Sequence, residues 1–264
     1  MSLRTRPKQT LAEAKAREII QKLGITLPNE IDVVKIAALR KIRVKERSLN
    51  GCDGMMVRKD NRAIISVRET IPNIKKKRFV IAHELGHVLL HPHIKQSDIF
   101  SLSKFEQMQY RNSHSEMEAN YFAAELLMPS HLFIDALNQV EPSFSEIKRL
   151  ANIFNTTLSA TAIQFVKYSR EPCAFIISKN LGKPWFYTAE GFEFWIEMRD
   201  TVHAYSVTAD TINHGKKNGR ANDVPAGVWF RGYSDSGKDY ITEESIILGN
   251  SGIAYTLLWV HDAI

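Results

Sequence analysis

The run Phe79–Leu90 constrains the fold of this chain more than any other segment. Its mainly apolar residues predict a buried helix, and Pro92 ends it. Within this helix stand His83, Glu84 and His87. Because buried His and Glu side chains are costly unless they are paired or bind a metal, the segment predicts a helix that carries a polar site into the core.

The spacing of these three residues is typical of a metal centre. His83 and His87 are four residues apart, so a helix puts both imidazoles on one face, within reach of one tetrahedral cation. Glu84 follows His83 and can act as the general base that deprotonates water. Zinc suits this chemistry because it lowers the pKa of water to about 7 and polarises a carbonyl; manganese is the alternative ion. The pattern predicts a zinc-dependent peptidase.

The third ligand that a catalytic zinc needs has three candidates. His93 has the spacing of the third histidine in metzincins, but Leu90 stands where that pattern needs a glycine. Glu116 and Glu118 lie in a predicted downstream helix, and a carboxylate from a second helix is the gluzincin solution. Both glutamates also have capping-box spacing, so the residues leave the choice open.

Two longer motifs carry a family resemblance. Arg78–His87 reads RFVIAHELGH, and Glu116–Pro129 reads EMEANYFAAELLMP. Together with the predicted strands around Gly54–Val57 and Ala63–Val67, they resemble the ImmA/IrrE family of zinc metallopeptidases over residues 30–130.

The resemblance implies roles for further residues and a class of substrate. It implies that Glu116 is the third ligand and that Asn120 orients a ligand by a hydrogen bond. Members of this family typically cut a helix-turn-helix transcriptional repressor in response to DNA damage or stress. We therefore expect this chain to cleave a regulatory protein of that kind, held in extended form by an exposed strand edge near Gly54–Val57.

Two other functions remain as alternatives. One is a DNA-binding transcriptional regulator with a structural zinc site. The other is a sensor or adaptor with a vestigial peptidase site, although the intact Glu84 argues against it. We expect Glu125 to have a structural role with a backbone or Arg partner. Several side chains could stabilise an oxyanion, namely His91, Tyr110, His114, Tyr121 and His131.

The pattern of the whole chain predicts an α+β protein in three parts. Residues 1–130 form a mainly helical, gluzincin-like metallopeptidase domain with a small sheet, residues 131–171 a helix-turn-helix-like segment, and residues 172–264 an α/β domain. The resemblance implies that this last domain is GAF-like and sensory. Helices are expected at 11–22, from Asp32, at 79–90, at 116–128 and as a pair across 143–167. Strands are expected at 42–44, 55–57, 63–67, 174–177, 203–207 and 227–230, with a hairpin of 245–248 and 253–260 and a loop or weak helix at 95–112.

The helix pair resembles a helix-turn-helix, yet its second helix is poorly equipped for DNA. It offers Leu158, Ser159, Thr161, Ala162 and Gln164, with no Lys or Arg before residue 167, whereas phosphate contacts normally dominate affinity. The net charge of +6 is concentrated near the start, where residues 1–50 hold 12 Lys/Arg against 5 Asp/Glu. A nucleic acid or acidic partner would explain this charge, and solvated lysines explain it equally well.

The cysteines and the hydropathy indicate the compartment. Cys52 and Cys173 have no metal or redox spacing, which is typical of reduced thiols in a cytoplasmic protein. No apolar stretch approaches the ~20 residues of a membrane helix, and no secretory signal is present. We expect a cytoplasmic protein without membrane contact.

Overall fold

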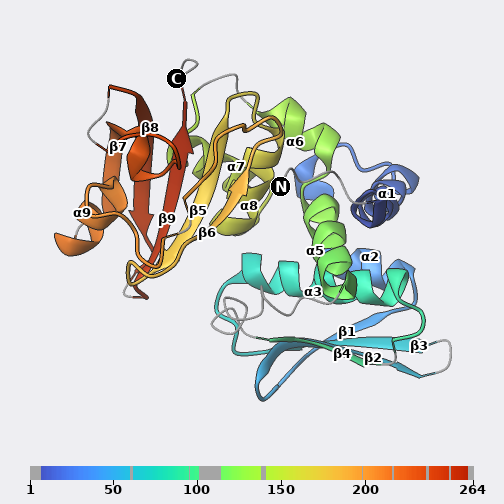
Figure 1. The fold of residues 1–264 in the computed structure, drawn as a ribbon. Coiled ribbons are helices and arrows are strands. Elements are labelled where there is room, and N and C mark those ends of the chain that lie inside the picture. Colours follow the sequence, from blue (N-terminus) through green and yellow to red (C-terminus); the bar gives the residue numbers. More distant parts are fainter. Residues whose placement is uncertain are drawn as a thin grey trace. The chain divides into compact units, whose positions relative to one another are not determined.

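The computed structural model describes residues 7–59, 62–94, 96–100, 114–137, 141–197, 199–215, 217–235, 238–249 and 251–260. The chain divides into two compact units (Figure 1). The first comprises the chain up to Leu137 together with Ala151–Thr157, and the second comprises residues 138–150 and the chain from Leu158 onward. Each unit combines helices with a sheet, so the predicted α+β class is confirmed.

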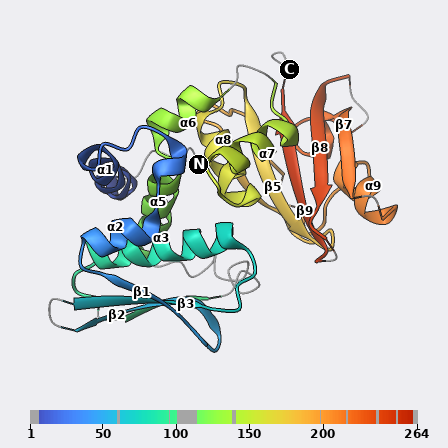
Figure 2. The same ribbon diagram turned by 180° about the vertical axis from the view of Figure 1, so that it is seen from behind.

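The first unit is a four-stranded sheet with helices on one face. Its helices are α1 (Pro7–Lys22), α2 (Val33–Leu39), α3 (Ile74–Leu90), α5 (His114–Leu127) and α6 (Ser130–Ala136), with a 3-10 turn at Pro28–Glu30. Its strands are β1 (Arg43–Arg47), β2 (Cys52–Lys59), β3 (Arg62–Arg68) and β4 (Gln96–Phe100). The strand order is β1-β3-β2-β4, with β1 parallel to β3 and the other pairs antiparallel. As Figure 2 shows from behind, α3 lies along the sheet and α5 packs on the side of α3 away from it.

Local signals explain where these helices begin and end. The side chain of Asn73 accepts hydrogen bonds from the backbone N–H groups of Lys75 and Lys76, so α3 begins five residues before the predicted start at Phe79. Its end at Leu90 before Pro92 is as predicted. Asp32 caps α2 in the same way as Asn73 caps α3.

The strand β4 was not expected. Residues 95–112 were predicted as a loop or weak helix, but Gln96–Phe100 pair with β2, from Val57↔Gln96 to Cys52↔Phe100. The prediction is wrong for these five residues because a strand stabilised by a distant partner needs no local periodicity; residues 101–112 lie outside the described part. The same pairing corrects the expected strand edge at Gly54–Val57, since β2 lies between β3 and β4 and the edge belongs to β4.

The second unit is built on a five-stranded antiparallel sheet. Its helices are α7 (Phe144–Ile153, whose last turn belongs to the first unit), α8 (Leu158–Tyr168) and α9 (Val207–Asn213). Its strands are β5 (Cys173–Lys179), β6 (Trp185–Thr188), β7 (Asn218–Pro225), β8 (Tyr240–Ile247) and β9 (Ile253–Trp259), in the order β6-β5-β9-β8-β7. The predicted pair of helices, the first strand and the final hairpin are confirmed as α7, α8, β5 and β8–β9.

Two predicted strands of this unit are wrong. Residues 203–207 lead into α9, whose start is capped by Ser206 and by the buried carboxylate of Glu243. That carboxylate accepts hydrogen bonds from the backbone N–H groups of Val207 and Thr208 and from Trp229 Nε1. Burial raises the pKa of Glu243, and these hydrogen bonds only partly offset the rise. Residues 226–228 form a 3-10 turn (Ala226–Val228) in place of the strand predicted at 227–230. The first of these predictions is wrong because Glu243, a capping partner distant in sequence, favours a helix start at Val207.

Both cysteines are free and buried. Burial raises the pKa of the Cys173 thiol to about 12, which makes it inert at neutral pH. No helix in the described part of the chain combines the length and apolar character that a membrane span requires.

Candidate metal centre

The centre lies where α3 and α5 come closest. A Cβ atom on Gly86 would lie 3.1 Å from the Ala119 Cα and 3.1 Å from the Phe122 Cδ1. Glycine at this position therefore allows the two helices to approach at van der Waals distance. Glu116 stands one helical turn before Ala119, where it meets the histidines of α3.

The structure brings His83, His87 and Glu116 into one cluster. The two histidine Nε2 atoms are 3.0 Å apart, and each lies 3.1 Å from a Glu116 carboxylate oxygen. All three ligand atoms lie within 4.8 Å of one another. Two Zn–N bonds at a tetrahedral angle would separate the nitrogens by about 3.3 Å, so this His₂Glu set fits one zinc ion.

The charge and orientation of these groups also suit a cation. Burial alone would raise the pKa of Glu116, but hydrogen bonds with His83 and His87 outweigh it and hold the pKa well below its usual range. Glu116 is therefore an anion at neutral pH. Asn120 Oδ1 lies 2.9 Å from His83 Nδ1 and can accept its proton in a hydrogen bond. With its proton on Nδ1, the lone pair of His83 Nε2 would be available to an ion in the cluster.

Glu84 accompanies the cluster on α3. Its side chain is fully buried, as are His83 and His87 on either side of it in sequence. Glu84 is thus a carboxylate screened from bulk solvent, next to His83 in the sequence of α3.

The rival candidates for the third ligand lie elsewhere. His93 is exposed. Glu118 Oε2 lies 2.7 Å from His91 Nε2, and His91 Nδ1 lies 3.2 Å from His87 Nδ1. Burial lowers the pKa of His91, and the hydrogen bond with Glu118 opposes that shift. The sequence analysis missed both contacts; the four-residue spacing between His87 and His91 was a signal for the contact between those two residues, whereas the contact from His91 to Glu118 depends on how α5 packs on α3.

Of the described oxyanion candidates, His91 contacts the cluster through His87. Both ring nitrogens of His91 are engaged in the hydrogen bonds just described. His114 and His131 are exposed, and Tyr121 is half-buried against the apolar core. Tyr110 lies outside the described residues.

Glu125 has the structural role expected for it. Its Oε1 accepts hydrogen bonds from the Ser130 backbone N–H and hydroxyl at 3.0 Å and 2.8 Å. Arg17 Nη1 lies 3.3 Å from the same oxygen. The buried carboxylate thus caps α6 and pairs with α1.

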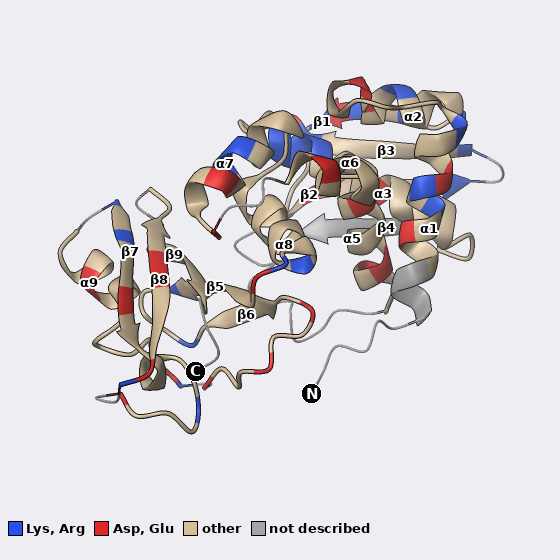
Figure 3. Cartoon of the chain, turned by 90° about the horizontal axis from the view of Figure 1, so that it is seen from above, with Lys and Arg blue, Asp and Glu red and all other residues tan. Residues whose placement is uncertain are grey.

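The helix-turn-helix resemblance does not extend to a DNA-reading surface. Thr161, Ala162 and Gln164, which would have to reach base edges, are buried in α8. Charges of the second unit are of both signs, and Figure 3 shows acidic residues on β7, β8 and α9. Both observations weigh against direct DNA binding by this helix.

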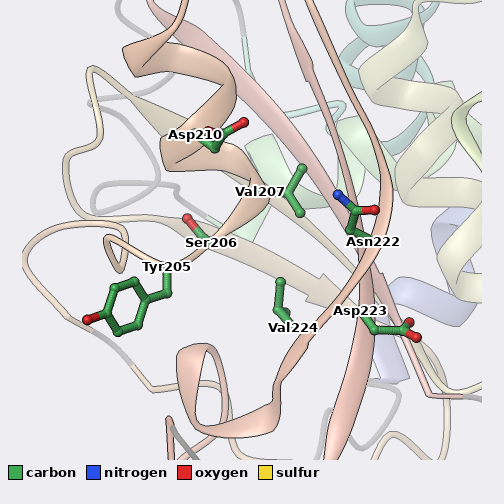
Figure 4. A pocket seen from close by; sticks show the side chains of 7 residues that line it. All are labelled: Tyr205, Ser206, Val207, Asp210, Asn222, Asp223 and Val224. Carbon is green, nitrogen blue, oxygen red and sulfur yellow. The ribbon is translucent and has the colours of Figure 1, made fainter.

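A shallow pocket lies on the second unit between α9 and β7 (Figure 4). Its volume is about 300 Å³, and its lining comprises Tyr205, Ser206, Val207, Asp210, Asn222, Asp223 and Val224. Asp210 and Asp223 stand at opposite ends, and both have partners, in His214 at 2.9 Å and Thr242 at 2.8 Å. None of the aromatic residues between 185 and 195 lines this pocket; Phe192 and Phe194 instead pack on the core of the unit.

Comparisons with known proteins agree with this centre. Residues 38–165 match the family model of the IrrE N-terminal-like domain, a peptidase family. The chain is 28% identical to metallopeptidase ImmA of Bacillus subtilis (strain 168) over 126 residues, which cover 47% of this chain and 69% of that protein. It is 27% identical over 172 residues to the uncharacterized immunity region protein 2 of Bacillus phage phi105, covering 59% of this chain and 99% of that protein.

The fold as a whole also has a solved counterpart. A Mycobacterium tuberculosis transcriptional regulator superposes with a TM-score of 0.61 at 17% identity, covering 96% of this chain and 76% of that one. At this identity the likeness concerns the fold alone. The family model and the two relatives agree on the N-terminal part: residues 38–165 match the IrrE N-terminal-like domain and support a place in the ImmA/IrrE family.

Proposed function

We propose that this chain is a gluzincin-type zinc metallopeptidase that cleaves a regulatory protein, a helix-turn-helix transcriptional repressor, in a stress or DNA-damage response. The observation that carries the proposal is the cluster of His83, His87 and Glu116 within 4.8 Å of one another, with the buried Glu84 following His83 in α3. The similar proteins include a metallopeptidase and a phage immunity region protein, which supports a regulatory substrate.

In this proposal His83, His87 and Glu116 hold the ion. A bound zinc ion would polarise the scissile carbonyl and acidify water. Glu84 then takes a proton from the attacking water and delivers it to the leaving amine. The extended substrate pairs with β4, the edge strand that contacts α3.

The remaining parts have supporting roles in the proposal. We retain the division into a peptidase domain at 1–130, a helical segment at 131–171 and a GAF-like sensory domain at 172–264. The pocket between α9 and β7 is a place on the described part of that domain where a small ligand would fit. The two alternatives, a structural zinc site and a vestigial peptidase site, differ from the proposal in one outcome. Under either alternative, Glu84→Gln would leave the function of the protein intact.

The first experiment is the metal content of the purified protein by mass spectrometry. We expect about one zinc per chain in the wild type and in His93→Ala, and loss of zinc in Glu116→Ala. The same proteins are then incubated with purified helix-turn-helix repressors encoded near this gene. A wild type that binds no transition metal even after zinc is supplied would refute the proposal.

A further inference from the structure

We propose that the outer face of the sheet in the first unit is a docking surface for a partner protein, which it binds through an amphipathic helix with an acidic flank. This is the face turned away from α3, and we call it the basic–apolar face. It is formed by three cations of β1 and three apolar side chains of β2 and β3, namely Arg43, Lys45, Arg47, Met55, Val57 and Ile64. The proposal goes beyond peptidase activity and does not depend on a bound metal.

The alternation of side chains along each strand determines which residues lie on this face. Val44 of β1 packs on the apolar core, and Glu46 pairs with Lys77 of α3 at 2.8 Å, so both point toward the helices. On the next two strands, Ile65 of β3 pairs with Met56 of β2, and both are fully buried on that same side. Because successive residues of a strand point to opposite faces, the neighbours of these residues in each strand belong to the outer face.

The register of the strands places the six residues in rows across the sheet. Arg43 of β1 lies opposite Ile64 of β3, which pairs with Val57 of β2. In the next row, Lys45 and Met55 lie on either side of β3 in the same way. The cations therefore form one column along the edge strand β1, and the apolar side chains lie beside it on the two inner strands. Neighbouring columns are about 4.8 Å apart.

The column of cations is open to a partner. All three β1 cations are exposed, and in the described part of the chain no carboxylate pairs with any of them. Asp53 of β2 is 1% exposed and is held by Arg68 and by Lys76, whose Nζ lies 2.6 Å from it, so its charge is compensated elsewhere. Val57 is 39% exposed, so apolar surface lies beside the column.

An acidic amphipathic helix matches this arrangement in repeat and in width. Cations two residues apart along a strand are separated by about 6.6 Å, and carboxylates one turn apart on a helix by about 6 Å. A helix is about 10 Å wide, so a helix that lies along β1 with its acidic flank over the cations has its apolar stripe over the inner strands. Exposed ion pairs contribute little affinity by themselves. The apolar contact therefore supplies affinity, and the charges select the partner and speed its association.

Two other occupants fit the face less well. Sheets that bind single-stranded nucleic acid stack its bases on aromatic rings, and none of the six side chains is aromatic. A second copy of this chain that presented the same face would bring two columns of like charge together. The observations favour an acidic protein helix, and the test distinguishes all three occupants.

Fluorescence anisotropy tests the proposal with a labelled synthetic peptide of about five helical turns, in which leucines recur every three or four residues and glutamates flank them. We expect the full-length wild type to bind this peptide saturably. Lys45→Glu should weaken binding at least about tenfold, and Val57→Thr, which has nearly the same shape as the wild type, about threefold. The matched controls Lys35→Glu and Val34→Thr, at exposed positions of α2, should change the Kd by less than about twofold. Circular dichroism of each variant verifies folding.

The absence of saturable binding up to about 1 mM peptide would overturn the proposal. Equal weakening by Lys45→Glu and Lys35→Glu would also do so, because the charge would then act without a defined surface. Tighter binding of an oligothymidylate of about 20 nucleotides than of the peptide would assign the face to nucleic acid instead. In analytical ultracentrifugation, a concentration-dependent dimer that Lys45→Glu abolishes would identify a second copy as the occupant and refute the proposal. None of these readouts involves zinc or cleavage, so a failure of the proposed peptidase function leaves them unchanged.

Discussion

Gly86 of α3 lies against Ala119 of α5 so closely that a Cβ atom on Gly86 would come within 3.1 Å of the Ala119 Cα and 3.3 Å of its carbonyl oxygen. Both neighbours are backbone atoms, which cannot rotate away. The contact sets the distance between the helix that carries His83 and His87 and the helix that carries Glu116. Small side chains at a helix crossing therefore determine the geometry of the centre.

We predict that Gly86→Val forces the two helices apart. The expected loss of stability is about 1–3 kcal/mol from overpacking, and zinc affinity should fall because Glu116 moves away from the histidines. Urea denaturation followed by far-UV circular dichroism measures the first effect, and chelator competition the second. An unfolding free energy and a zinc affinity equal to those of the wild type would show that the contact between α3 and α5 tolerates a side chain at position 86.

Glu84→Gln separates metal binding from catalysis. Gln has nearly the same shape as Glu but cannot take a proton, so we expect about one zinc per chain and a cleavage rate lower by about 10²- to 10⁴-fold. Glu69→Gln, at an exposed position, is the matched control and should cleave at the wild-type rate. Cleavage by a metal-loaded Glu84→Gln at the wild-type rate would remove Glu84 from the mechanism.

Arg78 of α3 joins two other segments of the first unit, one at Ile31 and one at Phe154–Asn155. Its guanidinium donates to the carbonyl oxygens of Ile31 at 2.8 Å, Asn155 at 3.1 Å and Phe154 at 3.4 Å. Arg78→Met leaves these carbonyls without that donor, and we expect a loss of about 1–3 kcal/mol of unfolding free energy. Far-UV circular dichroism suits this measurement, with Lys45→Met, at an exposed position of β1, as the control.

Glu244 makes the stability of the second unit depend on pH. Burial raises the pKa of Glu244 above the ordinary 4.5. A hydrogen bond from the Phe144 backbone N–H at 2.7 Å acts in the opposite direction but does not cancel the rise. A raised folded-state pKa stabilises the fold fully below pH 4.5, and this contribution is lost as the pH rises through the folded value. We predict that Glu244→Gln, whose amide oxygen can still accept from Phe144, loses less stability than the wild type between pH 4.5 and neutrality.

All four tryptophans lie beyond residue 172, so their fluorescence reports unfolding of the second unit. Urea titrations at several pH values, followed by this signal, give the pH dependence. If the unfolding free energies of Glu244→Gln and the wild type change with pH in parallel, the Glu244 carboxyl has the same pKa in the folded and unfolded chain, and the prediction is wrong.

The local features of the chain were predictable. Apolar periodicity and Pro92 placed α3, and the four-residue interval between His83 and His87 put both on one face of it. These features depend on neighbours within one or two turns, which is the range that a sequence pattern describes. The helix pair around Asn155 and the hairpin before Val260 were predicted for the same reason.

Only the tertiary structure decided the rest. The spacing left Glu116 and Glu118 unseparated as third ligands. The packing of Gly86 on Ala119 brought Glu116 to the histidines, while Glu118 contacts His91. In the same way β4 exists because β2 offers it a partner, and α9 replaces a predicted strand because Glu243 binds its first N–H groups. Each outcome depends on contacts between residues far apart in the chain, whose energies no local pattern contains.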